Sequence, residues 1–235
     1  MKDLRTYIKK QINEGFKLGK NKVKKEEDDF VDLDLPSGTL WATSNVGAKC
    51  ENDAKSWYGD YFMWGDPEPA TNRECSWRNY KYCNNDGESL TKYCHKNKPD
   101  YWGNKGRPDN KLVLDEEDDM VNVNMGEDWK LPTKEQLQEL IDNTTYEWVK
   151  DYNKISGLNG ILFTSKKNDN ILFIPAAGYR SVNSVDYAKS NIYIWASTLD
   201  DEFPDSAFYL YATNYFVDVS YYGRPRGFSI RGVMK

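Results

Sequence analysis

Residues 172–180 read LFIPAAGYR, an apolar run that is interrupted by a proline and then by a glycine. Similar short motifs order the rest of the second half: WKLPT at 129–133, WAS at 195–197 and GFSIRGV at 227–233. Only WKLPT opens a plausible helix, whereas the other motifs are typical of short aromatic strands and turns. Because no catalytic constellation lies among them, they indicate a rigid recognition surface rather than an active site.

Around these motifs the sequence predicts one helix and several strands. Thr133 can cap a helix with Gln136 in the capping-box position, and the apolar face of that helix includes Leu137 and Leu140. In the final GFSIRGV strand we expect Arg231 to point outward or to pair with a buried acid. Strands are expected at residues 31–35, 40–42, 160–164, 171–174, 192–196, 207–211, 215–219 and 227–233.

Residues 45–110 show little periodicity and are rich in Gly, Asn, Asp, Tyr and Trp. We therefore expect a long loop region that is held by aromatic anchors such as Trp57, Trp64 and Trp77. So much loop in a compact domain usually signals function.

The composition fits one large domain, or one domain with an appendage, in 235 residues. Aromatic residues make up 14%, including 17 Tyr and 8 Trp, and such side chains suit the recognition of sugars or proteins. No run approaches the roughly 20 apolar residues of a membrane span. The charged N-terminus lacks the apolar segment of a secretory signal, so we expect a protein that stays in the cytoplasm or leaves by lysis within a particle.

Charge divides the chain into a basic arm with its hinge at 1–29 and a body at 30–235. Residues 1–25 carry nine basic and two acidic groups, a net charge of +7, whereas residues 26–235 carry −12. Within the arm, an apolar stripe at four-residue spacing predicts a short amphipathic helix, which is marginal alone and is expected to dock on a partner or to oligomerise. A solubilising tail is the alternative, and nucleic-acid binding is weaker because few aromatics are interleaved. The docking residues are Leu4, Tyr7, Ile8 and Ile12.

Metal binding is not favoured. Cys50, Cys75, Cys83 and Cys94 form no C-x-x-C pair, and their irregular spacing favours reduced thiols over a zinc site completed by His95. The acidic run at 115–119 is open to two interpretations, a calcium site or a solvated charge run at a helix start. We favour the second because calcium loops interleave their ligands with Gly and Asn, so no cofactor is predicted.

Motifs spread over residues 30–235 resemble, in their order, the Fibrobacter succinogenes major paralogous domain. This resemblance implies an α+β, loop-rich domain of the C-type-lectin fold, related to the formylglycine-generating-enzyme type. The C-terminal part is also similar to the variable proteins that retroelements diversify in phages and bacteria, which end in a similar Gly-Phe-x-x-Arg strand. The motifs are LDLPSGTLWA at 33–42, YGDYFMWGD at 58–66, WKLPTKEQLQEL at 129–140, LFIPAAGYR at 172–180, WASTLDDEFPDSAFYLY at 195–211 and GFSIRGV at 227–233.

The arm, MKDLRTYIKKQINEGFKLGKNKV, is similar to short leaders on virion proteins of crAss-like phages. This resemblance implies a bacteriophage virion protein, such as a capsid-attached head fibre or a decoration protein, whose arm docks on other virion proteins. The body would then bind a host-surface glycan or protein. Fibre proteins are usually symmetric, so a homo-oligomer such as a trimer is expected. The alternative is a bacterial lectin-like adhesion protein, at the cell surface or in the cytoplasm, that is not part of a virion.

Enzymatic activity is not expected. The enzymes related to this fold use a pair of cysteines in the C-terminal half, and no cysteine of this chain follows Cys94. A Ser-His-Asp mechanism would have to use His95, the only histidine, whose Lys- and Asn-rich surroundings favour a solvated side chain.

A binding face is predicted instead near the C-terminus. Strand alternation places Phe208 and Leu210 on one face and Tyr209 and Tyr211 on the other. Sugar rings stack on aromatic faces, while Asn and Arg side chains hydrogen-bond their hydroxyl groups. Core or subunit-interface packing of the same tyrosines is the alternative. The candidate ligand-binding residues are Tyr193, Tyr209, Tyr211, Asn214, Tyr215, Tyr221, Tyr222 and Arg224.

Overall fold

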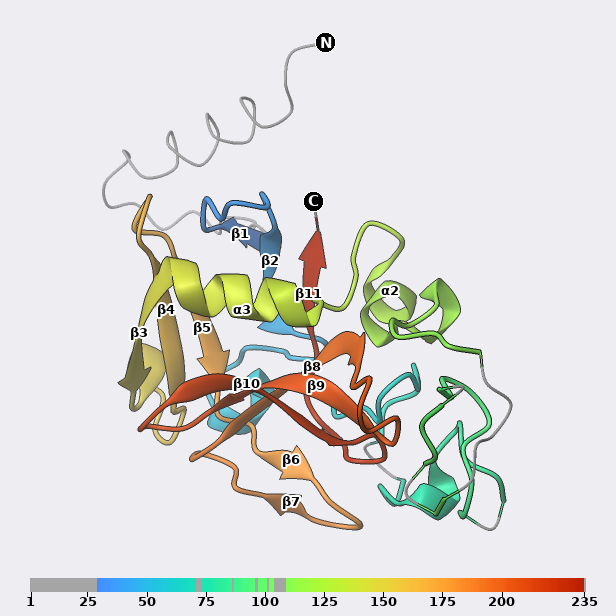
Figure 1. The fold of residues 1–235 in the computed structure, drawn as a ribbon. Helices are drawn as coiled ribbons and strands as arrows, with labels where there is room; N and C mark the ends of the chain where they lie inside the picture. The colour runs from blue at the N-terminus through green and yellow to red at the C-terminus, as the bar shows by residue number, and fades with distance from the viewer. Residues whose placement is uncertain are drawn as a thin grey trace.

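The computed structural model describes residues 29–70, 73–85, 87–95, 97–100, 102–103 and 109–234. The predicted docking residues Leu4, Tyr7, Ile8 and Ile12 lie outside the described residues. The body is rich in strands and loops, as the α+β expectation requires, and its α-helices in the described part are α2 (Met120–Met125) and α3 (Lys134–Asn143) (Figure 1). Neither of these two helices has the length and apolar character to span a bilayer.

One antiparallel sheet joins the two ends of the described body. It contains β1 (Phe30–Asp32), β2 (Leu40–Asn45) and β11 (Arg231–Met234), in the order β1-β2-β11, at the top of Figure 1. The expected strand at 227–233 is therefore regular only at its end. Its first half instead forms isolated bridges, from Phe228 to Phe62 and from Ser229 to Ile194.

A second antiparallel sheet follows α3. It contains β3 (Thr144–Val149), β4 (Gly160–Ser165) and β5 (Ile171–Pro175), paired in that order. The strands at 160–164 and 171–174 were expected, whereas β3 was not, although its sequence TTYEWV is rich in the β-branched and aromatic residues that favour strands.

The third sheet carries the predicted binding face. Its strands are β8 (Ile192–Leu199), β9 (Ser206–Ala212) and β10 (Val217–Gly223), and β9 lies in the middle. The strand expected at 215–219 begins two residues later because a turn at 213–216 closes the β9–β10 hairpin, where the Thr213 amide donates to the Phe216 carbonyl at 3.0 Å. The short strands β6 (Tyr179–Arg180) and β7 (Val185–Asp186) form a separate hairpin near it (Figure 1).

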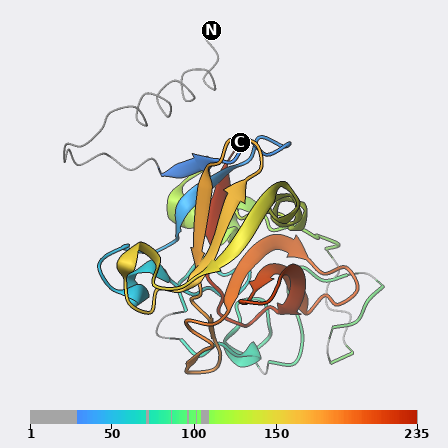
Figure 2. The same ribbon diagram turned by 90° about the vertical axis from the view of Figure 1, so that its left-hand side faces the viewer.

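Helix α3 covers the face of the third sheet that points into the main core. Thr133 and Gln136 form the predicted capping box, in which the Thr133 amide donates to Gln136 Oε1 at 2.9 Å. Leu137 and Leu140 are fully buried and share one apolar cluster with Leu210. The helix contacts β3 as well as β8, β9 and β10, and Figure 2 views it end-on beside them.

Of the expected aromatic anchors of the loop region, Trp64 is buried, whereas Trp57 and Trp77 are half-buried. In its described part the regular pieces are the short 3₁₀ turns Ala54–Trp57 and Trp77–Asn79. Trp64 is fully buried, and its indole donates to the Ala196 carbonyl of β8 at 2.8 Å. Trp195 donates in return to the Phe62 carbonyl at 2.9 Å. Each of these hydrogen bonds pairs a buried indole N–H group with a carbonyl oxygen, so neither polar group is left without a partner.

Arg231 does not point outward. Its side chain is buried, and it donates to Asn45 Oδ1 at 2.9 Å, to the Ala42 carbonyl at 2.9 Å and to the Phe173 carbonyl at 3.2 Å. Its described partners are neutral oxygens rather than the expected buried acid. Burial lowers the pKa of Arg231 to about 9. The residue therefore ties β11 to β2 and β5.

Candidate functional site

A pocket of about 340 Å³ opens on the face of the third sheet that points away from α3. Seven aromatic side chains and one amide line it. Four of them, Tyr193, Tyr209, Tyr211 and Tyr222, belong to the predicted binding residues. The full lining consists of Tyr179, Tyr187, Asn191, Tyr193, Tyr209, Tyr211, Tyr222 and Phe228, and we call it the tyrosine pocket.

Strand register explains why these side chains meet. Tyr193 of β8 pairs directly with Tyr211 of β9, and residues opposite each other in an antiparallel pair project to the same face. Alternation places Tyr209 on that face too, while Leu210 between them enters the core cluster below α3. The predicted two-faced character of β9 is thus confirmed.

Ring contacts build the floor of the tyrosine pocket. Phe228 stacks on the buried Trp195 with 4.1 Å between ring centroids. Tyr193 stacks on Tyr209 at 5.7 Å, and Tyr179 meets Tyr193 edge-on at 5.0 Å. Packed rings of this kind lose little conformational freedom on binding, so they present a preformed apolar surface.

Polar groups stand above this floor. The Asn191 amide donates to the Tyr193 hydroxyl at 3.2 Å and to the Tyr211 hydroxyl at 3.0 Å. Burial raises the pKa of Tyr209 to about 12 and also raises the pKa of Tyr193. These two phenols therefore stay neutral at physiological pH, and each can both donate and accept a hydrogen bond.

Charges lie at the rim rather than inside. The Arg226 guanidinium lies 5.6 Å from the ring centroid of Tyr222 and 6.0 Å from that of Tyr179. Asp218 is exposed and stands opposite Tyr211 in the β9–β10 pairing, so its carboxylate projects on the pocket side. One cationic and one anionic side chain thus flank the aromatic lining.

Four of the predicted binding residues lie elsewhere. Tyr221 projects to the opposite face of β10 and stacks on Phe203 at 5.5 Å, because neighbouring residues of a strand alternate. Asn214 and Tyr215 lie exposed in the β9–β10 turn, and Tyr215 is 87% exposed. These three residues form no part of the tyrosine pocket.

Arg224, the fourth of them, is completely buried rather than presented to a ligand. It donates to the Lys92 carbonyl at 3.2 Å, and its guanidinium lies 5.5 Å from the Trp64 ring centroid and 5.6 Å from that of Tyr80. Its role in the structure is to join the end of β10 to the loop region.

The pocket also contains residues that the sequence did not indicate. Tyr179 and Tyr187 come from the β6–β7 hairpin, and Asn191 precedes β8. The chain folds back here because Gly178, with φ of 68°, lets its amide donate to the Asn191 carbonyl at 2.9 Å. A side chain at Gly178 would collide with the Asp186 carbonyl, so the motif PAAGYR held a turn signal beside the pocket.

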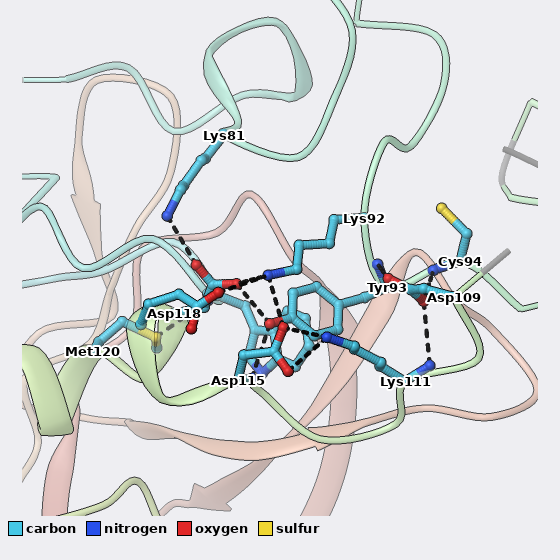
Figure 3. A network of polar contacts seen from close by, with 12 residues as sticks. Lys81, Lys92, Tyr93, Cys94, Asp109, Lys111, Asp115, Asp118 and Met120 are labelled. Carbon is cyan, nitrogen blue, oxygen red and sulfur yellow. Dashed lines mark hydrogen bonds and ion pairs between the residues drawn. The ribbon is translucent and has the colours of Figure 1, made fainter. Parts of the chain in front are cut away.

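The acidic run at 115–119 is solvated only in part, because its last two residues are buried. Asp118 is buried and accepts hydrogen bonds from Lys81 Nζ at 3.0 Å and from the Tyr93 hydroxyl at 2.7 Å, and it also pairs with Lys92 (Figure 3). Asp119 is buried too, and its carboxylate accepts from the Val121 amide at the start of α2. The expected helix start is therefore present, with Asp118 and Asp119 buried and Glu116 and Glu117 exposed.

Metal ligands gather at one place in the described part of the chain, where Asp115, Glu117 and Asp118 could contact one ion. Lysine side chains already form ion pairs with all three of these carboxylates. Lys92 lies 2.8 Å from Asp115, and Lys111 lies 2.6 Å from the same group (Figure 3). The acidic cluster is accounted for as a set of ion pairs that joins the loop region to α2.

The four cysteines are free thiols. Cys75 and Cys94 are buried, and burial raises the pKa of both, to about 11 for Cys94. Thiols with raised pKa values are poor nucleophiles at neutral pH. His95 is half-buried in the loop region, where its Nδ1 accepts from the Asn97 amide at 3.1 Å.

Comparison with known proteins adds no relative: the chain matches no protein-family model, no curated protein and no solved structure.

Proposed function

We propose that the protein is a non-enzymatic recognition protein that binds a host-surface carbohydrate in the tyrosine pocket. One observation carries this proposal, namely the gathering of seven aromatic side chains and one amide around a preformed cavity of about 340 Å³. That volume lies at the lower end of the range of small-molecule sites, which is roughly 300–1,000 Å³.

The lining matches both the apolar face and the hydroxyl groups of a sugar ring. The stacked floor offers aromatic surface to the C–H face of a pyranose. The neutral phenols, the Asn191 amide and the rim groups Arg226 and Asp218 offer the alternating donors and acceptors that hydroxyl groups need. A wholly apolar ligand would leave the Asn191 side of the pocket poorly matched.

Recognition fits the lining better than catalysis does. The groups that line the tyrosine pocket are phenols, one phenyl ring and one amide, none of which serves as a general base at neutral pH. The raised pKa values of Tyr193 and Tyr209 support the same assignment.

The fold of the body and the location of the protein are part of the same proposal. The resemblance of the ordered motifs supports a C-type-lectin-like body, and the strand-rich, loop-rich architecture is compatible with it. The resemblance of the arm to phage leaders supports a virion protein, a head fibre or decoration protein, whose body projects toward the host.

Two neighbouring tyrosines of β10 give a matched test. Tyr222 lines the pocket and is 41% exposed, whereas Tyr221 is 47% exposed on the opposite face. The full chain is applied to an array of bacterial surface polysaccharides and neutral oligosaccharides, and any binding is quantified by calorimetry. We expect Tyr222→Ala to weaken binding roughly tenfold or more, the loss of one good stacking contact, and Tyr221→Ala to leave it unchanged.

Either of two results would contradict the proposal. The first is the absence of carbohydrate binding over the whole array. The second is an equal loss of affinity in both variants, which would place the ligand away from the tyrosine pocket.

A further inference from the structure

A second cavity, larger than the tyrosine pocket at about 630 Å³, lies beside the C-terminal strand. One wall is the pairing of β11 with residue 130, where the Lys130 amide donates to the Val233 carbonyl at 2.9 Å. The end of β11, the residues around α2 and the start of α3 enclose it, and we call it the β11 groove. Its apolar lining includes Val113, Leu114, Leu131, Val233 and Met234.

The β11 groove combines this apolar lining with negative charge. Glu116, Glu127 and Asp128 line it and are exposed, whereas Lys130 is its single basic side chain. Lys130 is already engaged with Glu116 at 3.0 Å. Val113 is an apolar side chain of this groove that is 49% exposed. A ligand for this groove should therefore carry both apolar and cationic groups.

The basic arm of this chain has that combination. Residues 1–25 have a net charge of +7 against −12 for the remainder, and their apolar stripe contains Leu4, Ile8 and Ile12. Arg5 and Lys9 stand four residues apart, directly after Leu4 and Ile8, so a helix would place both cations beside the stripe. Such a stripe needs a surface to cover it.

We propose that the β11 groove receives the basic arm of a neighbouring copy of this chain, with the stripe against the apolar lining and the cations against Glu127 and Asp128. Such a contact is heterologous, because the arm of one copy meets a different surface of the next. Repeated head to tail, it closes into a ring such as a trimer if the rotation that relates neighbouring copies is the right fraction of a full turn. A closed ring would present several tyrosine pockets together, which raises avidity without any new ligand contact. This last benefit rests on the proposed function, whereas the arm–groove contact does not.

Light scattering on the full chain tests the contact, because a single copy has a mass of 27.3 kDa. We expect the wild type to show a small multiple of that mass. Glu127→Lys with Asp128→Lys should give monomers, since it places like charges in the groove. The matched control is Glu147→Lys with Asp201→Lys, which makes the same charge change at exposed sites outside the groove and should keep the oligomer.

A charge swap makes the test specific. Arg5→Glu with Lys9→Glu in the arm should also give monomers, and combining it with the groove reversal should restore at least a tenfold tighter assembly than either reversal alone. Because the contact is partly ionic, raising the salt to 1 M should weaken it.

Other results would overturn the proposal. A monomeric wild type whose arm resists trypsin would mean that the arm lies on its own body, and one whose arm is cleaved at once would mean that it has no site on this protein. An oligomer that survives the groove reversal would show that the stripes pack on each other instead. Tyr222→Ala should leave the mass unchanged and the groove reversal should leave the carbohydrate affinity per body unchanged, so the two proposals fail separately.

Discussion

A guanidinium buried among neutral oxygens shows how single residues set this fold. Arg231 donates to Asn45 Oδ1 and to the carbonyls of Ala42 and Phe173, which belong to two strands, β2 and β5, that are far apart in sequence. Desolvation disfavours the charge, as the lowered pKa of Arg231 indicates, but the three hydrogen bonds hold it in place.

Removing that guanidinium should destabilise the protein strongly. In Arg231→Met, the side chain keeps an apolar stem of similar width, yet three buried acceptors lose their donor, so we expect the free energy of unfolding to fall by about 3 kcal/mol or more. The exposed arginine variant Arg78→Met should change it by less than about 0.5 kcal/mol. Urea denaturation followed by tryptophan fluorescence measures both. An equal loss of unfolding free energy in the two variants would mean that the buried hydrogen bonds of Arg231 do not stabilise the fold.

At the scale of elements, the sequence predicted those features that depend on residues close to one another in the chain. The capping residues Thr133 and Gln136 and the β9 alternation were readable because neighbouring residues decide them. The position of Arg224 was not, because it depends on long-range packing: Arg224 is covered by the loop residues Trp64 and Tyr80. The same limit explains why only half of the pocket lining was found, with Tyr187 and Asn191 missed.

The acidic cluster before α2 shows the same limit and leads to a prediction about pH. Burial alone would raise the pKa of Asp118, but hydrogen bonds from Lys92, Tyr93 and Lys81 outweigh it and lower the pKa to about 2. The unfolded chain has the ordinary pKa of about 3.9. The folded state is therefore favoured by this carboxylate above that pH, and the advantage, about 2 kcal/mol, disappears as the pH falls toward 2.

Asp118→Asn should show this directly. At pH 7 the variant should be less stable than the wild type, because its amide cannot pair with the two lysines. Between pH 5 and 2 the wild type should lose stability more steeply than the variant, and the two curves should converge. Urea denaturation over this pH range gives the curves, with Asp201→Asn as an exposed control. Parallel curves would mean that Asp118 does not contribute to the acid transition.

At the scale of the whole molecule, the β1-β2-β11 sheet holds the first and last strands of the described body side by side. Its first and last described strands both pair with β2, and the apolar cluster below them contains Trp41, Val233 and the α3 residue Leu137. The second large cluster, around Trp64, Trp195 and Phe228, joins the loop region to the floor of the tyrosine pocket. Since β8 contributes to both clusters, a disturbance at the β11 end should reach the pocket.

A pair of valines tests this coupling. Val233 is buried at 3% exposure at the β11 end, whereas Val182, at 44%, lies in the β6–β7 turn much closer to the pocket in sequence. Val233→Asp places an unpaired charge in the core, so we expect the free energy of unfolding to fall by more than about 4 kcal/mol, whereas Val182→Asp should lower it by less than about 1 kcal/mol.

Far-ultraviolet circular dichroism reports the backbone structure of the whole body, and hydrogen exchange at the tyrosine amides reports the pocket. If the body is one unit, both probes will show a single coincident transition that shifts equally in Val233→Asp. A pocket that keeps its protection after the sheet signal is lost would instead divide the body into two independently stable parts, and the floor built by Trp195 and Phe228 would then suffice to hold the binding site.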